Sequence, residues 1–404
     1  MTAAAALASV LARAEGQAWA GNDPYDGLTT EIGRLVMPLG WLPRFGLSQI
    51  VLRFPLARWA LRPVRTVNSK ALALFLGATV AGRGELGDAR ARSAALNLVD
   101  ELARRGTKFD SDSTGWGYPF PWQSRSFWAP ANTPNAVVTG TVGWHLLTCW
   151  EVMGIDRARS LGLAAAAFLA RGLRATEGGR GEALAYTPSD HTRVVNISAI
   201  AARLLALSAT LQSSEPLRGK AGRLVRFVLD VQRPDGSWPY SADPGGTWED
   251  SFHTGYVLEA LINVNELGIP VPVEALARGF AAYARFFDPD GGARLYSSPS
   301  SIFDAHSAAQ GIITYAALDN SSYRSIPAWE GARTMALRIA SWAREALWLP
   351  SKGHFAYRIH GGRRDEREFT RWVQAWMAVA MATAAGLEAK TTVSSAPIKA
   401  VGAA

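Results

Sequence analysis

Six long runs rich in Ala, Val, Ile and Leu in this 404-residue chain each begin with polar side chains that can bind hydroxyls or transfer protons. These polar residues are Asn68 and Lys70; Asn135 and Thr139; His191, Arg193 and Asn196; Asp250 and His253; Asp304, His306 and Gln310; and Arg371 and Gln374. Several pairs are three or four residues apart, which places both members on one face of a helix. The sequence therefore predicts a polar mouth formed by the starts of several helices.

Two carbohydrate chemistries fit these residue types. A lyase or C5-epimerase that acts on uronic acids needs a group that neutralises the carboxylate and a base that abstracts a proton. Asn135, Arg193 or Arg371 could neutralise the carboxylate, and His253, His306 or Tyr118 could act as the base. A glycosidase instead needs two carboxylates on opposite sides of the scissile bond, for which the candidates are Asp112, Asp250 and Asp304.

A structural role is the alternative for most of these candidates. Asp250 and Asp304 stand where N-cap residues accept hydrogen bonds from free backbone amides. His253 and His306 could be packed, hydrogen-bonded side chains, and Asp112 could only shape a turn. The aromatic segment from Tyr118 to Trp128 is more typical of ligand contact. We expect the substrate-binding residues to be Lys70, Trp122, Gln123, Arg125, Asn135, His191, Arg193, Asn196, Arg371 and Gln374.

A repeat of about 58 residues indicates how these residues are positioned. Five similar segments place a tyrosine in the same slot, at Tyr118, Tyr186, Tyr240, Tyr296 and Tyr357. A polar loop and then an apolar run with helical periodicity follow each of them. The runs begin near Asn68, Asn135, Arg193, Ser251, Ala305 and Phe369, and second helices are expected at 88–105, 158–175, 217–232, 273–287 and 328–346. With helix 3–19 as the partner of 369–387, these twelve helices predict an all-α (α/α)6 toroid with short β-like loops at its mouth.

The same pattern divides the chain into four parts. Residues 1–20 supply the helix that closes the ring, and 67–387 form the toroid. Residues 21–66 form a connection rich in Arg, Pro and Trp, and the small-residue tail 388–404 is expected to be disordered.

The junction RLVRFVLDVQRPDGSWP is similar to the QW motif of triterpene cyclases, which is shared loosely by prenyltransferase β subunits. We expect Gln232 to bind backbone groups at a neighbouring helix end and Trp238 to pack on that glutamine, so the motif holds the ring together. A terpene cyclase or prenyltransferase remains an alternative function. However, Asp110-Ser111-Asp112-Ser113 lacks the last Asp of a protonating cluster, and Cys149 lies far along an apolar helix, away from any zinc site at the mouth.

Charge and composition narrow the partners. The net charge of +8 favours an acidic ligand, and the absence of zinc-finger, RNA-binding or helix-turn-helix signatures argues against nucleic acid. A single cysteine excludes an internal disulfide and fits a reducing compartment. The N-terminus does not look like a signal peptide, and no run approaches 18 uncharged apolar residues, so we expect a cytoplasmic protein with no metal or cofactor.

Residues 34–65 combine six arginines with interspersed aromatic and aliphatic residues and contain no acidic residue. Three prolines limit this segment to short amphipathic helices. Such helices could attach the protein to the surface of the inner membrane, or they could cover the outside of the ring.

The segments WAGNDPYDGL, LRPVRTVNSKALALFL and GWGYPFPWQSRSFWAPANTPN resemble the VpsJ-type polysaccharide biosynthesis proteins of bacteria. The resemblance covers most of residues 19–385. It implies an α/α toroid that makes or trims an exopolysaccharide or capsular glycan, and it assigns no catalytic residues. The partner is therefore expected to be an acidic polysaccharide or oligosaccharide, with a non-catalytic glycan-binding scaffold as a further alternative.

Overall fold

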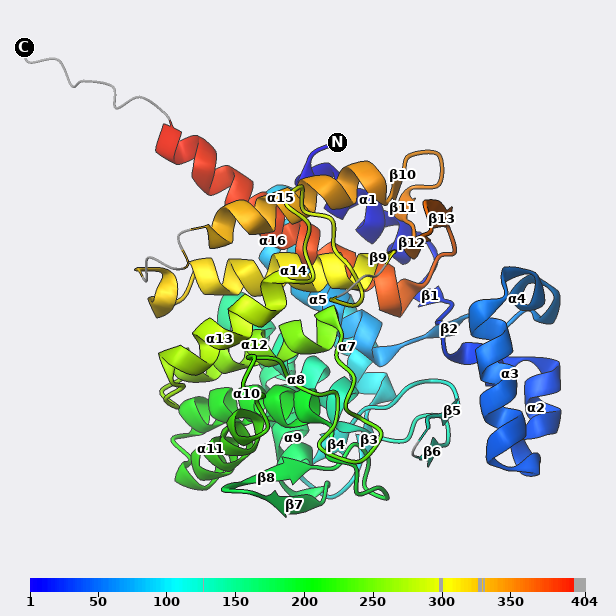
Figure 1. Ribbon diagram of the computed structural model, residues 1–404, viewed down its shortest axis with the longest axis horizontal. Helices are drawn as coiled ribbons and strands as arrows, with labels where there is room; N and C mark the ends of the chain where they lie inside the picture. Colours follow the sequence, from blue (N-terminus) through cyan, green and yellow to red (C-terminus); the bar gives the residue numbers. More distant parts are fainter. Residues whose placement is uncertain (126, 298–300, 326–328, 330, 396–404) are drawn as a thin grey trace, which may run out of the picture.

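In the computed structural model, six inner helices pack against one another as a closed ring. Figure 1 labels the helices along the chain. The structure describes residues 1–395 except 126, 298–300, 326–328 and 330. The inner helices are α5 (Ser69–Ala81), α8 (Ala136–Met153), α10 (Val195–Gln212), α12 (Ser251–Glu266), α14 (Ala305–Asp319) and α16 (Ala375–Ser395). Each contacts the next, and α16 contacts α5, so the ring closes. The predicted (α/α)6 toroid is confirmed.

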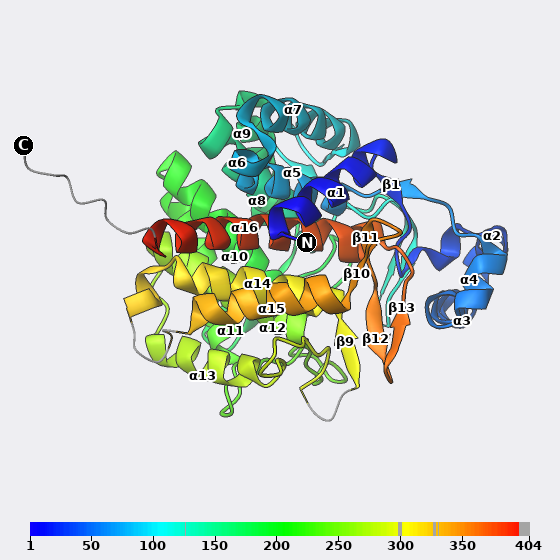
Figure 2. The same cartoon turned by 90° about the horizontal axis from the view of Figure 1, so that it is seen from above.

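Six outer helices cover this ring. They are α7 (Asp88–Arg105), α9 (Asp156–Arg171), α11 (Glu215–Asp230), α13 (Val273–Ala284), α15 (Ala332–Ala346) and α1 (Ala3–Gly16). The N-terminal helix α1 lies against α16 and α15, although it is nearly 400 residues from the end of the chain (Figure 2). Leu7 on α1 is fully buried. The outer helices are amphipathic, whereas the inner ones are buried on nearly all sides because they pack both outward and toward the axis.

Some predicted boundaries were too long. The helix expected at 158–175 ends at Arg171, because residues 175–184 form the hairpin β7 (Ala175–Gly178) and β8 (Gly181–Leu184). In contrast, α16 continues to Ser395, so the beginning of the tail that was expected to be disordered is helical. The rest of that tail, 396–404, lies outside the described residues.

Short strands border the mouth, as expected. Besides β7–β8, the hairpins are β3 (Thr107–Lys108) with β4 (Thr114–Gly115), β5 (Trp122–Gln123) with β6 (Trp128–Ala129), and β10 (Trp348–Leu349) with β11 (His354–Phe355). A three-stranded sheet joins β9 (Ile302–Asp304), β12 (Arg358–His360) and β13 (Arg363–Asp365), with all pairs antiparallel. A further pair joins β1 (Ala20–Gly21) to β2 (Thr66–Val67).

Residues 26–61 leave the ring and form a separate helical lobe (Figure 1). Its elements are η1 (Asp26–Thr29), α2 (Glu31–Val36), η2 (Met37–Leu39), α3 (Trp41–Arg53) and α4 (Pro55–Leu61). Leu28, Leu47 and Val51 form a small core that is separate from the main one. The lobe touches the mouth: Trp41 Nε1 donates to Ser124 O across 3.2 Å, and the Arg44 guanidinium lies 4.3 Å from the Trp128 ring centroid.

The segment that is similar to the QW motif connects two outer helices. Gln232 Nε2 donates to the carbonyl oxygens of Ala275 (2.8 Å) and Gly236 (3.1 Å). Trp238 donates to Val228 O and lies against Gly279, where an added Cβ would come within 2.7 Å of the indole. Gln232 thus ties the end of α11 to α13, which is a structural role.

One described helix, α10, is long and apolar enough to cross a membrane by length and composition alone. In the ring, however, 83% of that stretch is buried inside the protein. Its apolar character is accounted for by its place as an inner helix.

Candidate active site at the mouth of the ring

Four of the polar residues at the starts of the inner helices, Asn68, Asn135, Asp250 and Asp304, are N-caps. Asn135 Oδ1 accepts from Val138 N at 3.0 Å, and Asn68 Oδ1 accepts from Lys70 N at 2.9 Å. Asp304 Oδ1 accepts from the amides of His306 (3.0 Å) and Ser307 (3.2 Å). Both the capping role and the mouth location follow from the same topology, because every inner helix begins at this end of the ring.

His253 is held by a carboxylate. Asp250 caps α12 by accepting from His253 N at 2.9 Å, and its other oxygen lies 2.7 Å from His253 Nδ1. The His253 side chain is 22% exposed, whereas that of Asp250 is 4% exposed. A buried carboxylate on Nδ1 fixes the tautomer and leaves Nε2 to exchange protons at the mouth.

A small pocket opens beside this dyad. Its polar lining includes Asn196, Glu249, Asp250 and His253. Asn196 is buried, and its side-chain oxygen has no hydrogen-bond partner in the described part of the chain. The rings of Tyr240 and Trp248 stack at 4.4 Å between centroids and meet His253 edge-on. Trp248 is exposed and offers an aromatic face of the kind that sugar rings stack on.

A second histidine lies deeper. His306 Nε2 is 2.6 Å from the hydroxyl of Tyr256, and its Nδ1 has no partner among the described residues. Burial lowers the pKa of His306 well below its usual value, and the nearby positive charge of Lys70 lowers it further. His306 is therefore neutral at physiological pH. Phe252 lies between the two imidazoles, with its ring centroid 4.3 Å from His253 and 4.5 Å from His306.

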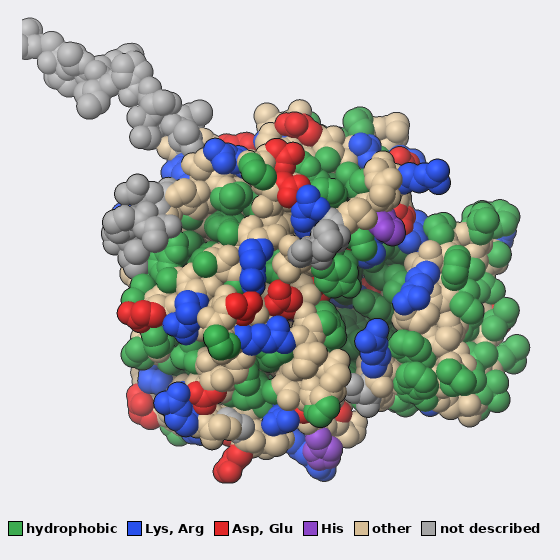
Figure 3. Space-filling model, in the orientation of Figure 1, with side chains coloured by type: hydrophobic (Ala, Val, Ile, Leu, Met, Phe, Trp, Pro, Cys, Tyr) green, Lys and Arg blue, Asp and Glu red, His purple; other side chains and the backbone are tan. Residues whose placement is uncertain are grey.

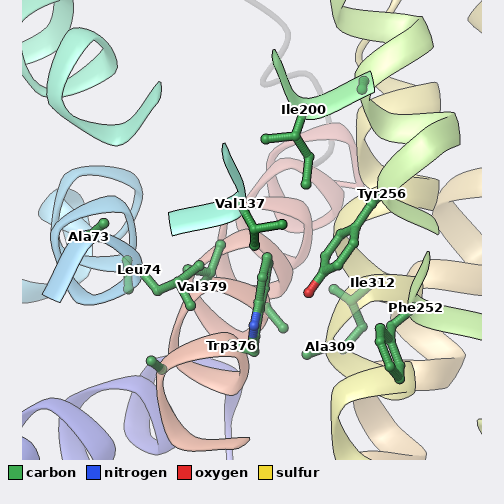
Figure 4. Close-up of a cluster of buried hydrophobic side chains, with 14 of the residues drawn as sticks. Ala73, Leu74, Val137, Ile200, Phe252, Tyr256, Ala309, Ile312, Trp376 and Val379 are labelled. Atoms are coloured by element: carbon green, nitrogen blue, oxygen red, sulfur yellow. The ribbon is translucent and has the colours of Figure 1, made fainter. Parts of the chain in front are cut away.

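Lys70 lies buried near the ring axis. Its Nζ is 5.2 Å from the ring centroids of both Tyr256 and Trp376, and no ion pair is formed with it within the described residues. Figure 4 shows Tyr256 and Trp376 pointing toward each other, with Val137, Ile200 and Ala309 around them. Desolvation and the charge of Arg371 lower the pKa of Lys70 well below its usual value.

Arg371 is engaged by a carboxylate from the N-terminal region. Its Nη2 donates to Asp23 Oδ1 at 2.7 Å, and its Nε donates to the other carboxylate oxygen. Both side chains are almost fully buried. The π-helical turn η5 (Thr370–Gln374) starts the sixth inner helix and places Arg371 5.0 Å from the ring of Tyr118. π-Helical turns of this kind are frequent at functional sites.

Aromatic rings fill the rim above this ion pair. Trp122 contacts Tyr25, Tyr118, Phe127 and Tyr186 at centroid distances of 5.2–6.3 Å. The hydroxyls of Tyr118 and Tyr186 are 3.2 Å apart. Burial raises the pKa of Tyr118, so this phenol stays protonated and is not poised to act as a base.

Six of the predicted residues are engaged in other contacts or lie exposed. Gln123 binds the backbone carbonyls of Ser124 and Phe127. Gln374 binds the backbone amide and carbonyl of Phe355. Arg193 is paired with Asp243 at 2.8 Å, and exposed His191 meets Arg174 at 3.2 Å. Asp112 lies exposed on the β3–β4 turn, and no described contact joins it to the other candidates. Arg125 is also exposed, on the β5–β6 hairpin. Arg193 and Arg371, which were both expected to bind the substrate, are thus already neutralised by Asp243 and Asp23.

A polar network forms the floor below Tyr256. Glu259 on α12 receives hydrogen bonds from Arg203 and, at 2.8 Å, from Gln310 Nε2. The guanidinium of Arg203 lies 4.3 Å from the ring centroid of Trp144. Inner helices α8, α10, α12 and α14 are thus tied together across the axis.

Sequence reasoning missed Asp23, Tyr256, Trp248 and Trp376. Asp23 lies in the loop Gly21-Asn22-Asp23-Pro24, and a carboxylate that becomes buried needs a cation. Tyr256 follows His253 by three residues and so shares its helix face, a spacing that could have identified it. Nothing in the local sequence distinguishes Trp376 from the other tryptophans.

Several solved structures of similar fold are named as sugar-active enzymes. They include a GH76 α-mannanase of Bacteroides thetaiotaomicron (12% identity, TM-score 0.60, covering 81% of this chain and 88% of that one). A cellobiose 2-epimerase from Bacillus thermoamylovorans is similar at 10% identity and TM-score 0.60, over 80% and 88% of the two chains. An inactive α-1,6-mannanase variant of Salegentibacter in complex with α-1,6-mannotriose is similar at 12% identity and TM-score 0.57, over 80% of this chain and 90% of that one.

These likenesses show the toroid fold. No protein-family model matches the chain, and no curated protein sequence matches it significantly.

Proposed function

We propose that this protein modifies a saccharide by proton transfer, with His253 as the acid–base residue and Asp250 as the residue that positions it. The observation that carries the proposal is the 2.7 Å contact between His253 Nδ1 and Asp250 Oδ2 beside an open pocket. Epimerisation, isomerisation and β-elimination all need such a group to remove a proton from carbon. The sugar-active names of the similar toroids support a saccharide as the substrate.

Glycoside hydrolysis is less well supported by the geometry. It needs two carboxylates that face one substrate. The carboxylate of Asp250 already accepts hydrogen bonds from His253 at the start of α12. Asp304 is fully buried and caps α14. Burial raises the pKa of Asp304, which favours its neutral form. No described contact joins Asp112 to either of them. Proton transfer by His253, by contrast, needs only the observed contact between His253 and Asp250.

The pocket suggests how a sugar would bind. The pocket is small, so a sugar would bind mainly against its rim, next to His253. Trp248 would stack on the ring, and the free oxygen of Asn196 would accept from a hydroxyl. Lys70 forms no ion pair with a described residue, and a carboxylate on the substrate that reached it would favour its charged form. An acidic sugar is therefore part of the proposal, as is a role in polysaccharide biosynthesis.

Solvent exchange tests this proposal directly. The purified protein is incubated in D₂O with cellobiose, mannobiose and an oligouronate, and proton NMR follows deuterium uptake and new products. We expect deuterium in a carbon-bound position, and a loss of roughly 100-fold or more in His253→Gln. Asp250→Asn should retain residual activity with a shifted pH profile, because His253 would lose the group that orients it.

The matched control is His191→Gln, at the exposed rim histidine, which should leave turnover unchanged. Wild-type turnover in His253→Gln would refute the assignment. Hydrolysis without deuterium uptake would show that the protein is a glycosidase. Sugar binding without any turnover would show that it is a non-catalytic binding scaffold.

A further inference from the structure

The helical lobe of α2, η2, α3 and α4 carries an exposed apolar surface that the ring does not use. Among the described residues, 16 large hydrophobic side chains are exposed, and ten of them lie between Ile32 and Val64. The most exposed are Leu35 (72%), Leu42 (70%), Leu56 (81%) and Trp59 (73%). In Figure 3, hydrophobic surface gathers over the lobe on the right of the molecule. A protein surface seldom leaves so large an apolar patch in water unless it binds something.

The lobe has a packed core of its own, and its exposed hydrophobic residues are not part of that core. Leu28, Leu47 and Val51 form that core, with Val36, Leu61 and Trp128 against it. Asp26 and Arg58 are joined by a buried ion pair of 2.7 Å beneath α4. The exposed side chains of α4, Leu56 and Trp59, are three residues apart and share one face of this short helix.

Positive charge accompanies the apolar residues. Residues 32–65 contain six arginines and no Asp, Glu or Lys. Arg53 and Arg62 are exposed and have no ion-pair partner in the described part of the chain, whereas Arg34 pairs with Glu31 at 3.1 Å. Exposed Trp and Leu interleaved with free arginines is the composition of surfaces that insert shallowly into a negatively charged lipid leaflet.

We propose that this lobe docks the protein on an anionic lipid bilayer, with Leu35, Leu42, Leu56 and Trp59 entering the interface and Arg53 and Arg62 contacting the headgroups. The inference is independent of the proposed sugar chemistry. A neutral protein partner would complement the apolar side chains but would leave the arginines without counter-charge.

Docking would also orient the mouth. The lobe is fixed to the rim by Trp41 with Ser124, by Arg44 over Trp128 and by Arg367 Nη1, which donates to Leu52 O at 2.8 Å. The lobe and the mouth therefore keep one relative placement, and the mouth would open close to the lipid surface.

Vesicle co-sedimentation tests the proposal at low salt, with vesicles of phosphatidylglycerol and phosphatidylcholine in equal parts against pure phosphatidylcholine. We expect binding to the anionic vesicles only, and weaker binding as salt rises. Leu56→Ser/Trp59→Ser and Arg53→Glu/Arg62→Glu should each lower the partition coefficient by roughly tenfold or more. The controls Leu96→Ser and Arg90→Glu/Arg338→Glu, on exposed residues of outer helices, should bind as the wild type does.

A second readout does not depend on the folding of these variants. Phosphatidylglycerol with brominated acyl chains should quench part of the tryptophan fluorescence of the wild-type protein, and Trp59→Phe should remove most of that quenching. Wild-type protein that stays in the supernatant with anionic vesicles, or lobe variants that bind as the wild type does, would overturn the proposal. A concentration-dependent dimer that Leu56→Ser/Trp59→Ser abolishes, without vesicle binding, would overturn it in favour of a second copy of this chain.

Discussion

Arg371 and Asp23 form a buried ion pair although 348 residues separate them along the chain. One of its members begins the sixth inner helix, and the other belongs to the loop that leads to the lobe. Thr370 N also donates to Asn22 O at 3.0 Å, and an added Cβ on Gly21 would come 1.7 Å from Thr370 Oγ1. The N-terminal loop is thus packed closely on the π-helical turn, and the ion pair joins this loop to the start of the sixth inner helix.

Removing one partner of this pair should be costly. Asp23→Asn leaves the Arg371 guanidinium buried without its counter-charge, which should lower the free energy of unfolding by about 3–5 kcal/mol. Chemical denaturation measures the change. The matched control is Asp110→Asn at the exposed Asp110–Arg171 pair, which should alter the melting temperature very little. An equally small effect of Asp23→Asn would mean that the pair contributes nothing to holding the mouth together.

Helix α1 should be an integral part of the ring. Leu7 is fully buried where α1 meets the ring, and Leu7→Ala would leave a cavity that costs about 2–5 kcal/mol of stability. Leu96→Ala, at an exposed leucine of α7, should change stability by no more than about 0.5 kcal/mol. Calorimetric melting of the two variants tests this. Equal melting temperatures would show that α1 is a dispensable attachment.

His306 should make the fold sensitive to acid. Because its folded-state pKa is lowered, the unfolded chain binds a proton more readily than the native protein does below pH about 6.5. Stability is therefore complete above that pH and falls by about 1.4 kcal/mol per pH unit below it until the folded pKa is reached. His306→Gln should show a shallower loss between pH 6.5 and 4.5 in urea unfolding. An identical slope in both proteins would contradict a neutral buried imidazole.

The buried amine of Lys70 should lower the stability of the folded protein. Its folded-state pKa is lowered, so at neutral pH folding must desolvate or deprotonate an amine that is charged in the unfolded chain. Lys70→Met keeps the volume and removes this cost, so it should stabilise the protein by about 1–4 kcal/mol. Exposed Lys108→Met serves as the control and should melt as the wild type does.

The same variant tests the acidic ligand. Lys70→Met should weaken binding of an oligouronate more than binding of its carboxyl-reduced form, which calorimetric titration can compare. Equal losses for the two ligands would separate Lys70 from recognition of a carboxylate.

The sequence alone determined the architecture. Helical periodicity and the recurring tyrosine slot predicted six hairpins, and helix 88–105 was placed at its observed bounds, because each apolar run must be buried against its neighbours. The polar starts of these runs also predicted the mouth, since all inner helices of such a ring begin at the same end. His253 and Asp250 were identified together because a spacing of three is contact distance on a helix.

Tertiary structure decided which of the charged candidates are free to act. Arg371 was predicted to bind a ligand, but Asp23 neutralises it, and Asp243 does the same to Arg193. Neither pairing can be inferred from local spacing, because the partners come from distant loops that only the closed ring brings together. Lys70 is a comparable case: its burial among Tyr256 and Trp376 depends on three helices meeting at the axis. Helical periodicity reports which face of one helix is apolar, and it carries no information about which charges meet across the ring.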